Sequence, residues 1–164
     1  MFLSTSVHTL DAKGRCFVPK RFQKQLDREE DGGNLQAVLA QGFGNCIFLF
    51  DRPGFHAMAA RLQTEAFEDD ELLTGQRLFF ANSIEVQLDS SGRVLIPAEL
   101  RAYAGLEDEV VMVGTMSRAE LWDKSAWERY LAENSKSFSK VVKMLSRGQK
   151  EAAAQASQGG DGGR

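Results

Sequence analysis

One ten-residue motif occurs twice in this chain, and it constrains the fold more than any other feature. Residues 10–19 read Leu-Asp-Ala-Lys-Gly-Arg-Cys-Phe-Val-Pro, and residues 88–97 read Leu-Asp-Ser-Ser-Gly-Arg-Val-Leu-Ile-Pro, so that Arg15 corresponds to Arg93. Leucine, aspartate, glycine, arginine and proline keep their order and spacing. Because units of about 70 residues are marginally stable alone, the repeat predicts two similar halves that share one core.

A second correspondence closes each half. An aromatic residue and an aspartate are followed by another aromatic residue, five positions after the first. These residues are Phe50, Asp51 and Phe55 in the first copy and Trp122, Asp123 and Trp127 in the second, a shorter separation than that between the two ten-residue motifs. The polar stretch 27–34 has no equivalent in the second copy, so it predicts a longer surface loop that accounts for the difference.

These boundaries suggest three parts. We expect a first repeat with linking helices over 1–72, a second repeat with a C-terminal helix over 73–150, and a disordered tail over 151–164. The tail is rich in Ala, Gln and Gly and cannot bury enough apolar surface to become ordered.

Each motif is typical of a tight turn that forms a hairpin. Asp11 can accept hydrogen bonds from the turn amides, and Gly14 can adopt the positive φ that closes a type I turn with a bulge. Asp89 and Gly92 repeat this pattern in the second copy. We therefore expect strand 6–10 to pair with strand 15–18 across the first turn.

The remaining pattern alternates short apolar strands with helices. Helices are expected from Pro19, Pro53, Asp69, Pro97 and Lys124, with Gly105 ending the fourth in a left-handed conformation. Further strands are expected at 35–40, 46–50, 83–88, 93–96, 109–113 and 120–122. The fold class is therefore α+β and rich in β-strand.

No residue pattern predicts catalysis or a metal site. Cys16 and Cys46 are typical of reduced, buried thiols, and His8 and His56 have no acid or cysteine at ligand spacing. There is no Ser/His/Asp order, CxxC, HExxH or phosphate-cradling glycine loop. We therefore expect no enzyme activity, no cofactor and no small-molecule substrate.

Composition and the N-terminus favour a cytoplasmic protein with no membrane partner. The chain is 43% hydrophobic and 26% charged, which is ordinary for a soluble protein. No apolar run approaches the ~20 residues that span a bilayer. The first residues show neither a basic start nor an apolar block, so they do not predict a secretory signal.

The distribution of charge favours a nucleic-acid partner, although the net charge is −3. Residues 12–26 contain five basic residues and no acid, whereas residues 90–102 sum to only +1. A local positive patch is what phosphate binding requires, so the first repeat should face DNA. Since one patch of five bases is small, several copies should act together in an oligomer.

The two arginines are the strongest candidates for DNA contact. A guanidinium on a rigid strand can bind a phosphate or the O6 and N7 atoms of guanine, although Arg15 could also simply pair with Asp11 and brace the hairpin. Both interpretations can hold. A catalytic Asp11–Asp89 pair is disfavoured because glycine and arginine follow each aspartate as a turn requires. The candidate DNA-binding residues are Lys13, Arg15, Lys20, Arg21 and Arg93.

The chain resembles the MraZ family of bacterial transcriptional regulators, which contain two AbrB-like (SpoVT-AbrB) repeats. The resemblance rests on the paired Asp-x-x-Gly-Arg motifs and on segments 79–85, 100–106, 109–114 and 120–122. It implies a double-split β-barrel, assembly into rings, and binding of short direct DNA repeats upstream of the division and cell-wall gene cluster, usually as a repressor at the nucleoid. By position, the DNA-contacting motifs fall on Asp11, Lys13, Arg15, Asp89 and Arg93.

One alternative from a different functional class remains. The basic patch could bind an acidic protein, including the acidic block at 65–71 of a neighbouring subunit, so that the protein acts as a scaffold ring without specific DNA recognition.

Overall fold

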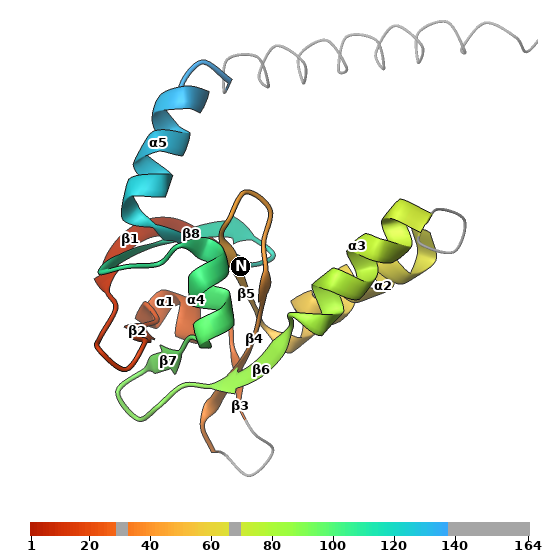
Figure 1. The fold of residues 1–164 in the computed structure, drawn as a ribbon. Coiled ribbons are helices and arrows are strands. Elements are labelled where there is room, and N and C mark those ends of the chain that lie inside the picture. The colour runs from red at the N-terminus through yellow and green to blue at the C-terminus, as the bar shows by residue number, and fades with distance from the viewer. Residues whose placement is uncertain (29–32, 66–69, 138–164) are drawn as a thin grey trace, which may run out of the picture. The chain divides into compact units, whose positions relative to one another are not determined.

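The protein is described here by a computed structural model that covers residues 1–28, 33–65 and 70–137. Met1–Trp127 form one body that contains both motifs, and the chain from Glu128 onward is a separate unit. The strands are β1 (Phe2–Thr9), β2 (Arg15–Phe17), β3 (Asp27–Arg28), β4 (Leu35–Gln41), β5 (Ile47–Phe50), β6 (Ile84–Gln87), β7 (Arg93–Leu95), β8 (Glu109–Met116) and β9 (Ala119–Asp123). The helices are α1 (Lys20–Gln23), α2 (Arg52–Glu65), α3 (Asp70–Ala81), α4 (Ala98–Ala104) and α5 (Lys124–Asn134) (Figure 1).

The two repeats exchange strands. Within the described residues, one antiparallel sheet has the order β1-β8-β9-β5-β4-β3, with β6 also paired to β4 (Figure 1). The first strand of each repeat thus pairs with the apolar hairpin of the other, as β1 does with β8 and β6 with β4. The fold is therefore α+β and rich in strand, as predicted.

The strand register reveals a pseudo-two-fold axis. In the two-stranded sheet β2–β7, Cys16 lies opposite Val94, the residue that occupies its place in the second ten-residue motif. In the β5–β9 pair, Phe48 lies opposite Glu120, its equivalent when Phe50 is matched with Trp122. The axis passes between residues that the sequence repeat matches. The structural symmetry therefore relates the same two halves as the sequence repeat.

The predicted local hairpin is wrong. Across the first turn only Leu10 and Cys16 form a single bridge, and Arg15–Phe17 pairs instead with Arg93–Leu95 of the other repeat. The amide of Val18 donates to the Gly92 carbonyl at 2.9 Å, and the equivalent bond in the other direction is also 2.9 Å. The reason is that β1 aligns along its whole length with β8, forming more pairs than the short returning strand could offer.

Both repeats contribute to one core. Phe22 of α1 and Leu100 of α4, which occupy equivalent positions, are buried in the same apolar cluster. Phe2 packs edge-on against Phe22 with ring centroids 5.4 Å apart. A second cluster joins the Phe48 and Phe50 face of the sheet to α2 and α3. The expectation of a shared core is met within Met1–Trp127.

Glycine and aspartate residues mark the ends of several helices. Gly105 ends α4 with φ +58°, as expected. The Asp51 carboxylate accepts a hydrogen bond from the Gly54 amide at 2.9 Å, and Asp123 caps α5 in the same way through Ser125 and Ala126. The aromatic-acid pattern therefore marks the strand end and helix start in each repeat.

Several details differ from expectation or lie outside the description. The helix after Pro19 is only four residues long, and part of the expected loop 27–34 is strand β3. The proposed tail over 151–164 lies outside the described residues. None of the described helices is long and apolar enough to cross a membrane.

Candidate nucleic-acid interface

Two equivalent loops form the centre of the site. In the first loop (residues 11–14), Asp11 Oδ1 accepts hydrogen bonds from the amides of Lys13 and Arg15, both at 2.9 Å. Gly14 has φ +79°, and Gly92 repeats this value in the second loop (residues 89–92). A left-handed residue closes each loop, so glycine is favoured at both places. Asp11, Gly14, Asp89 and Gly92 thus form two tight turns, although neither turn connects the paired strands of a local hairpin.

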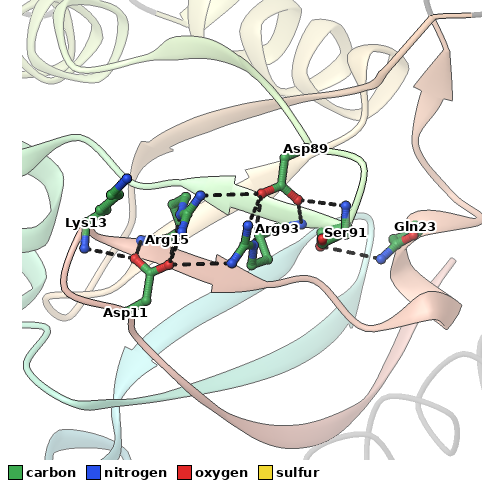
Figure 2. Close-up of polar contacts among 8 residues, drawn as sticks. Asp11, Lys13, Arg15, Gln23, Asp89, Ser91 and Arg93 are labelled. Atoms are coloured by element: carbon green, nitrogen blue, oxygen red, sulfur yellow. Dashed lines mark hydrogen bonds and ion pairs between the residues drawn. The ribbon is translucent and has the colours of Figure 1, made fainter.

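The strands β2 and β7 bring the two loops together, so that Asp11, Arg15, Arg93 and Asp89 form the arginine row (Figure 2). Arg15 Nε and Nη2 each lie 2.8 Å from Asp11 Oδ2. Arg93 makes the same two 2.8 Å contacts with Asp89 Oδ2. Each aspartate therefore fixes the arginine of its own repeat.

Cross-repeat contacts complete the row. Arg15 Nη1 lies 3.9 Å from Asp89 Oδ2, and Arg93 Nη1 lies 3.7 Å from Asp11 Oδ2. These distances are too long for hydrogen bonds, so within the described residues both Nη1 groups keep their donors for a partner. The arginine side chains are 30% and 35% exposed, which leaves them accessible from solvent. The row therefore holds two guanidinium groups in fixed positions, with their Nη1 groups available as hydrogen-bond donors.

The aspartates stay ionised over a wide pH range. The amide of Arg15, and next its side chain, lower the pKa of Asp11 to about 2 from an ordinary value of 3.8. The amide and side chain of Arg93 lower the pKa of Asp89 in the same way. Because the charged form accepts these hydrogen bonds, the bracing of the loops depends on ionised carboxylates.

We expect Asp11 to titrate with a midpoint near pH 2 in the folded protein. Since the folded pKa lies below 3.8, the stabilisation is fully present above pH 3.8 and is lost as the pH falls toward about 2. A carboxyl carbon NMR titration measures the midpoint directly. In Arg15→Ala the midpoint should rise but stay below 3.8, because the amide, which has the larger effect, remains; a midpoint at 3.8 in the unchanged protein would contradict the bracing.

Each loop is covered by a helix from the other repeat. Gln23 of α1 packs on Gly92, and its Nε2 donates to the Val18 carbonyl at 2.7 Å. Arg101 of α4 packs on Gly14, where an added Cβ would lie 2.7 Å from its Cζ atom. Within the described residues, Arg101 Nε is buried without a hydrogen-bond partner and its guanidinium pairs with no carboxylate. The sequence analysis did not identify Arg101. Its position in the second repeat is equivalent to that of Gln23 in the first, and this equivalence could have pointed to it.

The remaining predicted residues do not form one patch. Lys13 is exposed on the first loop. Lys20, on α1, lines a cleft with Asp89 of the second loop. Arg21 extends toward β1, where its Nη2 donates to the Thr5 carbonyl at 3.2 Å. The positive charge of residues 12–26, which is continuous in sequence, is thus spread over the first loop, the cleft at the second loop and the surface beside β1.

Within the described residues, both thiols are buried and no metal-binding cluster is found. Cys16 and Cys46 are buried, and burial raises the pKa of each to about 12. The described ranges contain no group of three or more His, Cys, Asp or Glu residues that could hold a metal ion.

Comparison with known proteins agrees with the two-repeat architecture. A family model described as "MraZ protein, putative antitoxin-like" matches residues 1–77 and again 79–147. A protein named "Transcriptional regulator MraZ" from Acetivibrio thermocellus is 35% identical over 145 residues, which cover 88% of this chain and 96% of that protein. Proteins with the same name from Moorella thermoacetica (34% identity; 88% and 96% covered) and Salinispora tropica (36%; 86% and 94%) are similar over most of their lengths. This chain therefore belongs to the MraZ family.

Proposed function

We propose that this protein is a sequence-specific DNA-binding repressor of the bacterial division and cell-wall gene cluster. It binds short direct repeats in double-stranded DNA at the nucleoid. The names of its relatives support a role in transcription regulation. The observation that carries the proposal is the arginine row, in which aspartates fix Arg15 and Arg93 while their Nη1 groups make no hydrogen bond within the described ranges.

The chemistry of the row suits reading of the major groove. Arginine recognises guanine O6 and N7 through two donors, and each such contact provides about 1–3 kcal/mol of discrimination. Side chains held in one geometry lose little conformational freedom on binding. The exposed Lys13 beside the row would add a phosphate contact, which strengthens binding without reading sequence.

The exchanged strands support the finer description of the fold as a double-split β-barrel. In that arrangement one loop lies at each end of the shared two-stranded sheet β2–β7. Each subunit offers only one such row, so direct repeats in DNA would be bound by several subunits. A ring of subunits provides this avidity, since linked weak contacts bind far more tightly together than singly.

We expect the protein to bind a labelled fragment carrying the direct repeats from its own gene cluster roughly a thousandfold more tightly than a scrambled fragment at moderate salt. Fluorescence anisotropy over a salt series measures both affinities. Equal affinities would remove the claim of specificity. Mass measurement in high salt is the control for the scaffold alternative, which requires the ring to dissociate when its basic and acidic surfaces are screened.

A further inference from the structure

A polar cleft lies where α1 of the first repeat meets the second loop. It encloses about 160 Å³, and its polar walls include Lys20, Gln23, Asn34, Asp89 and Ser90. A wider hollow of about 360 Å³ adjoins it and shares Lys20 and Gln23. We call the smaller space the Lys20 cleft. It adjoins the arginine row and shares Asp89 with it.

Among the described residues, Lys20 and Asp89 are the charged ones that line the Lys20 cleft. The Lys20 ammonium group donates to Gln23 Oε1 at 3.3 Å, and within the described residues it pairs with no carboxylate. Asp89 also lines the cleft, yet Arg93 already contacts its Oδ2 at 2.8 Å. The Asp89 Oδ1 atom accepts hydrogen bonds from the amides of Ser91 and Arg93. The negative charge on the wall is therefore compensated, whereas that of the lysine is not.

Ser90 supplies hydrogen-bond donors to the same space. It is exposed, and among the described residues neither its amide nor its hydroxyl makes a hydrogen bond. A lysine ammonium group next to a free hydroxyl and a free amide is a combination that binds phosphate oxygens.

The pseudo-symmetry shows that these two groups occur on one side only. The residue equivalent to Ser90 in the first loop is Ala12, and the residue equivalent to Lys20 on α4 is Ala98. Both members of the pair are thus absent from the corresponding place beside the first loop. A requirement of the fold would apply to both sides, so the pair Lys20 and Ser90 points to a ligand.

We propose that the Lys20 cleft binds one phosphate group of the DNA backbone beside the second loop. This inference rests on the proposed function. It adds a second phosphate contact to the one proposed for Lys13. Lys13 lies at one end of the arginine row, while Gln23 and Ser91 lie at the other (Figure 2). The phosphate contacts of Lys13 and Lys20 would therefore flank the two arginines, one on each loop, although both lysines come from the first repeat.

Two substitutions test the proposal with little risk to folding. Lys20→Ala and Ser90→Ala each install the residue that the equivalent position already holds. Lys20→Ala should weaken binding to repeat and scrambled DNA by the same factor, about tenfold, and should reduce the salt slope by about 0.9, the value for one phosphate that is no longer neutralised. Ser90→Ala should weaken binding a few-fold without changing the slope. The double variant should match Lys20→Ala, because both groups hold one phosphate.

The matched control is Lys13→Ala, whose effect should add to that of Lys20→Ala because the two lysines lie on different loops. If the unchanged protein binds DNA but Lys20→Ala and Ser90→Ala leave affinity unchanged or act additively, the cleft proposal fails and the proposed function stands. If the unchanged protein binds neither DNA, both fail. If inorganic phosphate at millimolar concentration shifts the Ser90 amide resonance while both variants keep full DNA affinity, the site is for free phosphate and the DNA proposal is overturned.

Discussion

Replacing Arg15 by alanine should weaken binding to repeat DNA about 100-fold, and replacing Arg93 by alanine should weaken it to a similar extent. The loss of a two-donor contact to guanine accounts for about 1–3 kcal/mol. Removal of the guanidinium also leaves the Asp11 carboxylate without its closest cation at the proposed DNA-binding surface. The resulting repulsion between this carboxylate and the DNA phosphates places the effect toward the upper end of that range.

The expected similarity of the two effects comes from geometry. Charge in the sequence alone favours Arg15, since five basic residues lie in its segment and few surround Arg93. In the structure, each arginine makes the same pair of 2.8 Å contacts with its own aspartate and one longer contact with the other. Because Lys20 lies beside the second loop, that loop also has a basic neighbour.

Anisotropy titrations at one salt concentration measure these effects. Arg52→Ala is a suitable control, because Arg52 is an exposed arginine that pairs with Glu85 rather than with the row. Arg15→Lys keeps the charge but loses the two-donor geometry, so it should bind scrambled DNA normally and discriminate poorly. Near-normal binding by Arg93→Ala would show that only the first loop contacts DNA, as the charge pattern suggests.

Local features of the fold could be predicted from sequence because they depend on single residues. Asp11 accepts turn amides, Gly14 and Gly92 adopt positive φ, and Gly105 ends a helix. The expected amides were those one and two residues after Asp11, whereas the observed ones are two and four residues after it. Each follows from the chemistry of one side chain and a few neighbouring peptide groups. The repeat itself correctly predicted a core shared by both halves.

The strand exchange could not be predicted in this way. Whether β1 pairs with the strand after its own turn or with β8, far along the chain in the other repeat, depends on packing of the complete sheet. The same exchange places Arg101 on the first loop and Lys20 beside the second. Summing charges along the sequence therefore grouped Lys20 with the first loop, whereas in the structure Lys20 lines a cleft at the second loop.

The two loop glycines should differ in their sensitivity to substitution even though both have φ +79°. Alanine at either position is strained by about 1–2 kcal/mol in a left-handed conformation. At Gly14 the new methyl group would meet the end of the Arg101 side chain, which can move. At Gly92 it would overlap Gln23 Nε2, which is buried and bonded to the Val18 carbonyl. Displacing that amide adds about 1–3 kcal/mol for an unsatisfied buried group.

Gly92→Ala should therefore reduce the free energy of unfolding by about 3 kcal/mol, and Gly14→Ala by about 1–2 kcal/mol. Urea denaturation at one fixed protein concentration measures both values, since any self-association would make stability concentration-dependent. The double variant Gly92→Ala/Gln23→Ala isolates the cause: once the Gln23 side chain is removed, the extra destabilisation at Gly92 should disappear and only the backbone strain should remain. Equal values for the two single variants would mean that Gln23 moves aside freely, and that the helix from the first repeat does not hold the second loop in place.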